Sequence, residues 1–258
     1  MTLPALFLSH GAPTLALENN AVTRAWGDLG RTLAPRAVVA VSAHWDTPGP
    51  EVTTAPRLAT IHDFFGFPRP LYEIRYEPPG DPALAERVAA LLGRAGLATA
   101  GDAARGLDHG GWVPLRFLFP AAEIPVIQLS VQSGLDAAHH VAMGRALAPL
   151  RGEGVLVLGS GGIVHNLREL DWHGGGGAVM PWARAFNDWI ADRVADRDEA
   201  ALVGWRERAP DPRRAHPTTE HFMPFFVALG GGGFPARRMD LGFDLGSLGM
   251  DGYAFGAA

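Results

Sequence analysis

Two histidines stand where apolar, strand-like runs of the chain end. His10 follows the run at residues 5–8, and His44 follows the run at residues 37–42. Ligand sites in α/β sheets form at strand ends, and imidazole is the commonest protein ligand for transition metals. Structural alternatives are that His10 caps the next helix and that His44 is half-buried and bonded to backbone. Because the chain has no cysteine, His, Asp, Glu or backbone oxygen must bind any metal. The pattern favours a metalloenzyme.

His216 and His221 lie near the end of the chain, five residues apart. On one helix, this spacing would point the two side chains about 140° apart. Pro217 favours a break instead, with His216 before a helix at residues 218–229 and His221 in its first turn. Glu220 adjoins His221 and is an alternative ligand.

Two more histidines follow glycine-containing or acidic turns. His109 follows Asp108 and precedes two glycines, which suits an acid or base and equally a helix cap. His165 follows a glycine-rich stretch at residues 159–162. That stretch matches neither the dinucleotide-binding nor the Walker pattern. A glycine-rich turn that delivers one histidine into a cleft explains it as well as a phosphate loop does.

Aromatic residues are candidates for the walls of a substrate cleft. His62 precedes the sequence DFFGFP, which contains Phe64, Phe65 and Phe67, and Tyr253 lies in an expected strand near the C-terminus. An aromatic substrate needs apolar walls with a few polar anchors. We expect at least one of these phenylalanines, or His62, to line the cleft; the alternative is that the phenylalanines are core residues.

Alternating elements predict an α/β fold, formed as a single domain over residues 1–258 with a central, mostly parallel or mixed sheet flanked by helices. Short apolar runs predict buried strands at residues 5–8, 37–42, 124–131 and 155–158. Helical patterns cover residues 20–33, 81–95, 135–148, 181–194 and 218–229, the last stopped by the four glycines at 230–233. His139 and His140 are expected to be solvated on their helix, and His173 and the glycines at 174–177 to lie in a surface loop.

Composition excludes several classes of function. The net charge of −5 without a basic stripe argues against nucleic-acid binding. No apolar run approaches the roughly 20 residues that span a membrane. The N-terminus has no secretory pattern, so a cytoplasmic location is expected. We expect a monomer or small homo-oligomer that acts on small molecules.

Seven segments together resemble the DODA-type family of extradiol aromatic ring-opening dioxygenases, within the class III superfamily. Their order along nearly the whole chain makes the resemblance specific. The segments are FLSHGAP (7–13), VSAHW (41–45), IHDFFGFP (61–68), YEIRY (72–76), LDHG (107–110), GSGGIVHNL (159–167) and HPTTEHF (216–222).

The resemblance implies that His10, His44 and His221 bind the metal and that His165 is the catalytic acid or base. It further implies that His109 and His216 lie next to the metal or on the substrate. Related class III enzymes use two histidines and a glutamate, whereas His221 stands at the third position here. The family's reaction makes Fe(II) the expected cofactor, but three neutral histidines suit Zn(II) equally, so the sequence does not settle which metal is bound.

The implied reaction opens the ring of a catechol with dioxygen, and a DOPA-like or other substituted catechol is the substrate class that the family suggests. Two rival functions use the same residues. One is a zinc-dependent hydrolase on the three histidines. The other is a non-catalytic binding protein of the same fold.

Overall fold

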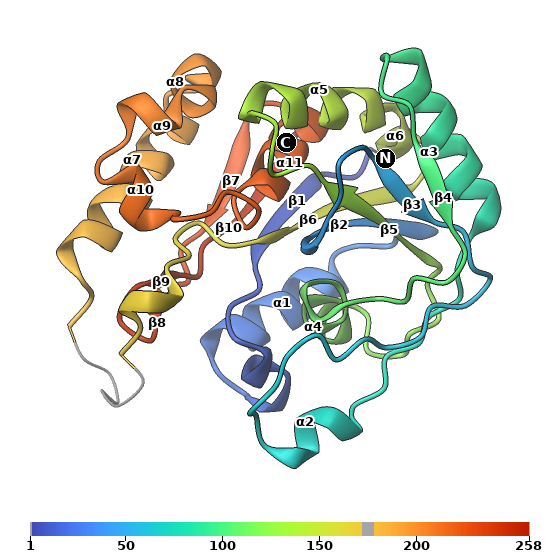
Figure 1. Cartoon of the computed structure of the whole chain (residues 1–258), viewed down its shortest axis with the longest axis horizontal. Helices are drawn as coiled ribbons and strands as arrows, with labels where there is room; N and C mark the ends of the chain where they lie inside the picture. Colours follow the sequence, from blue (N-terminus) through green and yellow to red (C-terminus); the bar gives the residue numbers. More distant parts are fainter. Residues whose placement is uncertain (1, 172–177, 258) are drawn as a thin grey trace.

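One mixed sheet organises the chain (Figure 1). The computed structural model describes residues 2–171 and 178–257, and within them eight strands form this sheet in the order β4-β3-β5-β2-β6-β1-β10-β7. The strands are β1 (Ala5–Ser9), β2 (Ala37–Asp46), β3 (Glu51–Thr53), β4 (Ala100–Asp102), β5 (Val126–Val131), β6 (Val155–Gly161), β7 (Ala236–Met239) and β10 (Gly252–Phe255). A separate two-stranded sheet pairs β8 (Phe243–Asp244) with β9 (Leu248–Gly249).

The four central strands, β5, β2, β6 and β1, are parallel to one another. Strands β10 and β7 add antiparallel pairs at one side, and β3 joins β5 in antiparallel orientation at the other. The α/β fold with a mixed sheet and flanking helices, predicted from the alternation of elements, is confirmed. All four predicted strands form, and their observed bounds differ from the predicted ones by a few residues.

Helices cover both faces of the sheet (Figure 1). One face packs mainly against α3, α5, α7 and α11, and the other against α1, α4 and a 3-10 turn. The longer helices are α1 (Ala21–Arg31), α3 (Pro82–Arg94), α4 (His109–Leu118), α5 (Ala137–Leu147), α7 (Pro181–Ala195) and α11 (Met223–Gly232). The short ones are α2 (Arg69–Glu73), α6 (Pro149–Gly152), α8 (Glu199–Val203), α9 (Trp205–Arg208) and α10 (Pro212–Ala215), with 3-10 turns η1 (Pro13–Leu17) and η2 (Leu167–Glu169).

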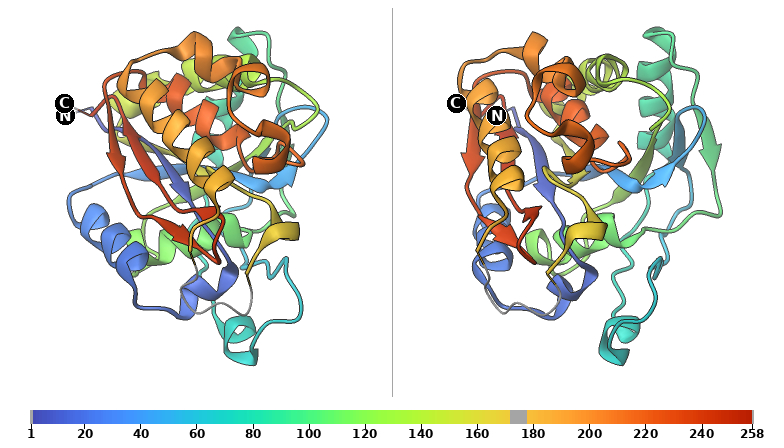
Figure 2. Two further views of the ribbon diagram at one scale, coloured as in Figure 1. Left: turned by 90° about the vertical axis from the view of Figure 1, so that its left-hand side faces the viewer. Right: turned by 60° about the vertical axis from the view of Figure 1, so that its left-hand side comes forward.

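Alternation along the central strands explains the two-faced core. In β1, Leu6 and Leu8 face one helical layer, whereas Ala5 and Phe7 face the other. Successive strand side chains point to opposite faces, so a strand buried on both sides reads as a continuous apolar run. The segment that contains α2 extends away from the sheet (Figure 2), and its N-terminal part returns to the sheet edge that carries the histidines.

The C-terminal helix begins and ends later than the predicted range of residues 218–229. The helix begins at Met223 rather than residue 218, because the backbone N–H groups of Phe222 and Met223 both bond to the carbonyl of Thr219 in a preceding turn. The run of four glycines does stop it, but only at its last member: the helix runs through Gly232 and ends at Gly233, where φ is +64°. A Cβ on Gly230 would overlap the carbonyl of Val141 in α5, so this glycine serves close helix packing.

His140 is fully buried, so the prediction that it is solvated is wrong. Its ring lies over the start of α5: Nδ1 donates to the Asp136 carbonyl at 2.8 Å, and Nε2 accepts from the Gln132 backbone N–H at 3.2 Å. These bonds satisfy both ring nitrogens, and burial lowers the pKa of His140 to about 4. The predictions for His173 and the glycines at 174–177 lie outside the described residues.

No helix in the described part of the chain is long and apolar enough to cross a membrane.

Candidate metal centre and substrate cavity

Parallel neighbours in the sheet bring the site histidines to one edge. His10 directly follows β1, and His44 lies in the C-terminal part of β2, beyond a register shift that starts after Val41. Both strands flank β6, so their carboxyl ends meet. The turn that carries His221 lies against the end of β6, where the Gly162 N–H donates to the His221 carbonyl at 2.8 Å.

The glycines after β6 serve this close approach. A Cβ on Gly161 would overlap the carbonyl of His221, and one on Gly159 would overlap that of Pro224. The glycine-rich stretch thus admits the His221 turn, and of the two interpretations left open by its sequence the structure favours the one that needs no phosphate.

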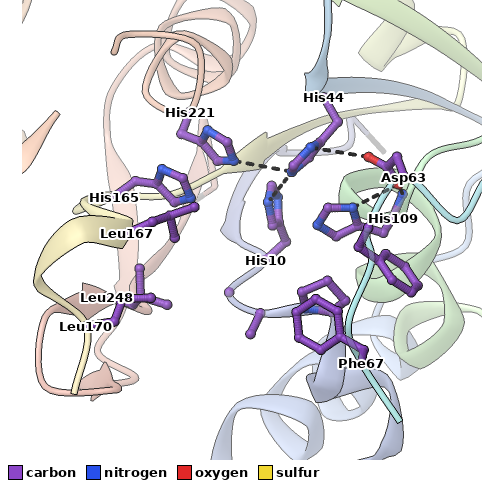
Figure 3. A pocket seen from close by; sticks show the side chains of 14 residues that line it. His10, His44, Asp63, Phe67, His109, His165, Leu167, Leu170, His221 and Leu248 are labelled. Atoms are coloured by element: carbon purple, nitrogen blue, oxygen red, sulfur yellow. Dashed lines mark hydrogen bonds and ion pairs between the residues drawn. The ribbon is translucent and has the colours of Figure 1, made fainter. Parts of the chain in front are cut away.

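His10, His44 and His221 converge through their Nε2 atoms (Figure 3). Nε2 of His44 lies 3.1 Å from Nε2 of His10 and 3.2 Å from Nε2 of His221. Two nitrogens bound to one ion at about 2.0–2.2 Å, with an angle between about 90° and 110°, lie roughly 2.8–3.6 Å apart. The spacing therefore fits a shared metal ion.

An oxygen of a neighbouring side chain lies beside Nδ1 of each of the three rings. Nδ1 of His10 lies 3.0 Å from Ser160 Oγ, whose hydroxyl donates to the Gly110 carbonyl. Nδ1 of His44 lies 3.2 Å from Asp63 Oδ2, and Nδ1 of His221 lies 3.0 Å from Glu220 Oε1. An oxygen beside Nδ1 favours the tautomer with the proton on Nδ1, and in that tautomer all three Nε2 atoms present lone pairs.

Three lone pairs that face one another repel unless a cation lies between them. Burial, and then the neighbouring histidines, lower the pKa of His10 and His221 well below the usual range. The pKa of His44 falls to about 4 for the same reasons. Protonation is thus disfavoured, and neutral imidazoles that aim lone pairs at one point are the donor set of a transition-metal site. The residues present fit the implied metal.

Asp63 connects the metal-facing histidines to a fourth one, and the sequence did not single it out. Its Oδ1 accepts from Nδ1 of His109 at 2.9 Å and from the His109 backbone N–H at 3.0 Å, while Oδ2 faces His44. Burial alone would raise the pKa of Asp63, but the His109 hydrogen bond and the nearby imidazoles outweigh it and lower the pKa to about 2. Asp63 is therefore an ionised carboxylate that contacts two imidazole rings, those of His44 and His109.

His165 lies on the opposite side of the centre. Its ring stacks on that of His221, with centroids 3.4 Å apart and planes at 6°. Its backbone N–H donates to the Ala215 carbonyl at 2.9 Å, which holds the turn. Burial, followed by the neighbouring histidines, lowers the pKa of His165 to about 3.

A buried network clamps the backbone of His44. Its N–H donates to Ser42 Oγ, and its carbonyl accepts from Arg105 at 3.1 Å. Ser42 and Arg105 both donate to Asp108, at 2.7 and 2.8 Å. Asp108 also caps α4 through the Gly111 N–H, so the same carboxylate positions His44 and the helix that begins at His109.

The histidines open onto a cavity of about 250 Å³. Its polar end consists of five histidines and Asp63, and its remaining walls are apolar (Figure 3). The lining residues are His10, Gly11, Ala12, Pro13, His44, Asp63, Phe64, Phe67, His109, His165, Leu167, Leu170, His221 and Leu248. Phe64 and Phe67 lie in the cavity wall, where we expected at least one ring of the DFFGFP segment.

Four predicted site residues are not among those that line the cavity. Phe65 is 92% exposed, and its neighbours Phe64 and Phe67 take the place expected for it. Nε2 of His62 bonds to the Ile74 carbonyl at 3.1 Å, and its ring packs on Phe64. His62 thus supports a wall residue of the cavity.

His216 and Tyr253 are fully buried. Nε2 of His216 donates to the Ile163 carbonyl at 2.8 Å, and its ring stacks on Phe222, with centroids 4.8 Å apart. His216 therefore supports the turn that precedes His165 rather than reaching a substrate. Tyr253 points into the core between β10 and α11, against Phe225 and Phe255.

Sequence reasoning also missed the leucines of the far wall, Leu167, Leu170 and Leu248. They come from a 3-10 turn, the loop after it and a two-residue strand, none of which has a periodic pattern. The position of Asp63 within the segment IHDFFGFP was the one indication of its role in the sequence, but His62 was chosen as the candidate site residue of that segment.

Two other groups of potential ligands occur among the described residues. They are His44, Asp63 and His109, and His165, Glu220 and His221, each with ligand atoms within 4.8 Å of one another. In both, the carboxylate already bonds to an imidazole Nδ1. Only the group formed by His10, His44 and His221 offers three unshared Nε2 atoms within the described ranges.

A family model described as the catalytic LigB subunit of aromatic ring-opening dioxygenase matches residues 4–242. The chain belongs to this family. The resemblance drawn from the seven sequence segments is thereby confirmed.

Similar proteins span nearly the full length of the chain. A 4,5-DOPA dioxygenase extradiol of Escherichia coli K12 is 43% identical over 96% of this chain and 93% of its own. Proteins of the same name from Portulaca grandiflora and Beta vulgaris are each 41% identical, over 97% and 88% of this chain and 95% and 86% of their own. The crystal structure of an uncharacterized Escherichia coli K12 protein matches with a TM-score of 0.82 and 37% identity, over 98% of this chain and 99% of that one.

Proposed function

We propose that this chain is a metal-dependent extradiol dioxygenase that opens the ring of a catechol with O2. The observation that carries the proposal is the convergence of three Nε2 lone pairs, from His10, His44 and His221, at the floor of a cavity with aromatic walls. Membership of the aromatic ring-opening dioxygenase family supports it.

We propose Fe(II) as the metal that these three histidines hold. Fe(II) held there would relay electrons from a bound catechol to O2 and would acidify the catechol hydroxyls, whereas Zn(II) has no redox chemistry. Three neutral histidines also suit Zn(II), so zinc is expected to occupy the site without supporting ring opening.

The chain's own residues then have distinct tasks. His165, beside His221 on the cavity wall, is a neutral imidazole because burial lowers its pKa, so it is free to take the proton of a catechol hydroxyl and readily returns it later. His109 has its Nδ1 on Asp63, which leaves Nε2 to bond with a substrate oxygen. Phe64 and Phe67 flank the ring and keep water out.

The test is ring opening by the purified protein, loaded anaerobically with Fe(II) and then exposed to air with a catechol. We expect a coloured ring-opened product with Fe(II) and none with Zn(II). His10→Ala should lose both metal and product, whereas His139→Ala, a histidine on α5 outside the cavity, should retain them. Binding of catechol without product would contradict the proposal and favour a binding protein. Zinc-dependent ester hydrolysis that needs His10 would favour the hydrolase.

A further inference from the structure

The cavity divides into a polar end and an apolar end (Figure 3). His10, His44, His109, His165 and His221 gather with Asp63 at the polar end. Opposite them, Leu170 and Leu248 form one wall and Phe67 stands on another. A catechol whose hydroxyls point to the histidines therefore directs its ring substituent toward the apolar side chains.

Apolar character continues to the mouth of the cavity. Leu167 lines the cavity and is also 58% exposed, which places it at the rim. Exposed leucines are common singly, but here Leu167 adjoins a wall that is already formed by leucine and phenylalanine. The surface that meets a substituent is thus apolar from the inner wall to the rim.

Charged partners for a substituent are absent among the described lining residues. Asp63 is the only carboxylate there, and it already bonds to His109 and His44. No lysine or arginine lines the cavity within residues 2–171 and 178–257. Residues 172–177 have the sequence WHGGGG, which contains no Lys, Arg, Asp or Glu.

Glu169 and Arg168 are charged residues close in sequence to Leu167 at the rim, and neither lines the cavity. Glu169 pairs with Arg214 at 2.7 Å. Arg168, next to Leu167, is exposed and is not among the lining residues.

The relatives named for DOPA imply a substrate with an ammonium and a carboxylate on its side chain. Moving those charges out of water without partners is costly, whereas burying methylene groups is favourable. We propose that this chain selects catechols that carry a neutral, apolar substituent over those that carry an amino-acid side chain. This inference rests on the proposed ring-opening reaction, and it concerns which substituent the cavity favours.

The test compares two sets of catechols in the Fe(II)-loaded protein. The alkyl series is 4-methylcatechol, 4-ethylcatechol and 4-propylcatechol, and the charged compounds, with a three-carbon side chain like that of 4-propylcatechol, are 3-(3,4-dihydroxyphenyl)propionate and DOPA. We expect kcat/KM to rise by up to about fourfold with each methylene that the cavity buries. DOPA should fall below 4-propylcatechol by about tenfold or more, because its charges lose water without gaining partners. Anaerobic calorimetry should rank the affinities in the same order.

A pair of variants tests the cause. Leu167→Arg places a cation at the rim, on a half-exposed position that tolerates a long polar side chain. It should raise kcat/KM for the propionate relative to 4-propylcatechol by about tenfold, as a charge-assisted bond would. Leu135→Arg makes the same change at another exposed leucine, outside the cavity, and should leave the ratio unchanged.

Turnover and calorimetric affinity together distinguish a failure of the proposed substituent preference from a failure of the proposed ring-opening reaction. If DOPA or the propionate equals or exceeds 4-propylcatechol in both kcat/KM and affinity, the selection for apolar substituents is refuted, and capture by Arg168 becomes the better account. If no catechol is opened, the proposed reaction is refuted, and the calorimetric ranking alone still decides which substituent the cavity favours.

Discussion

Replacing Asp63 with asparagine should damage the metal centre through hydrogen bonding alone. The carboxylate accepts an N–H bond from His109 through Oδ1, and its Oδ2 lies 3.2 Å from Nδ1 of His44 as an ion-pair partner. An asparagine of the same shape has one oxygen and one NH2 group, and NH2 cannot accept. One imidazole must therefore lose its partner or move its proton from Nδ1 to Nε2. For His44, a proton on Nε2 removes the lone pair that faces the metal.

The structure sets the size of this effect. One hydrogen bond to an ionised carboxylate contributes about 1.5–3 kcal/mol. The lowered pKa of Asp63, about 2, reflects the stabilisation of its ionised form by His109 and its neighbours. Loss of one such bond corresponds to roughly 10- to 100-fold in metal affinity, the range typical of residues that orient metal ligands.

The assay is a competition titration of Co(II) or Zn(II) against a coloured chelator, which needs no catalysis. Asp63→Asn should weaken binding by about 10- to 100-fold. Asp198→Asn is the matched control: Asp198 caps α8 by accepting the Ala201 N–H, and asparagine caps a helix equally well. Metal affinity within twofold of the wild type in Asp63→Asn, with unchanged turnover, would refute the reasoning.

Three further outcomes are expected. His165→Gln should keep its metal, by elemental analysis, and lose about 10²- to 10⁴-fold in kcat; loss of metal would make His165 a ligand. Gly110→Ala should lower unfolding free energy by about 1–3 kcal/mol in urea titrations, because its Cβ would overlap Ser42 Oγ; wild-type stability would contradict this. His140 has a folded-state pKa lowered from 6.5 to about 4, so the unfolded chain binds its proton first as the pH falls. From pH 7 to pH 5 the wild type should therefore lose about 2 kcal/mol more stability than His140→Gln, and equal losses would count against it.

The pattern of apolar residues was sufficient to predict the α/β architecture, because the central strands are buried on both faces of the sheet. Their continuous apolar runs could be read directly, and the histidines at the ends of β1 and β2 follow from the same pattern. Parallel pairing on β6 then brings those ends together. The sequence thus placed His10 and His44 at strand ends, whereas the pairing that makes them neighbours came from the structure.

The remaining site residues depend on contacts that no local pattern records. Asp63 reaches His109, 46 residues away, from a loop without regular structure. Gly230 looked like a helix stop, yet it lies inside α11 because Val141 leaves no room for a side chain. The sequence predicted His140 to be solvated. Its ring instead folds back and bonds to the Asp136 carbonyl at the start of its own helix, and no spacing of apolar residues in the sequence distinguishes that buried position from an exposed one.

Anomalous diffraction from crystals loaded with Fe(II) under anaerobic conditions tests the central claim most directly. The account predicts one iron peak per chain, at about 2.0–2.2 Å from Nε2 of His10, His44 and His221, with its open side toward the cavity. A peak between His165, Glu220 and His221, or between His44, Asp63 and His109, would contradict it.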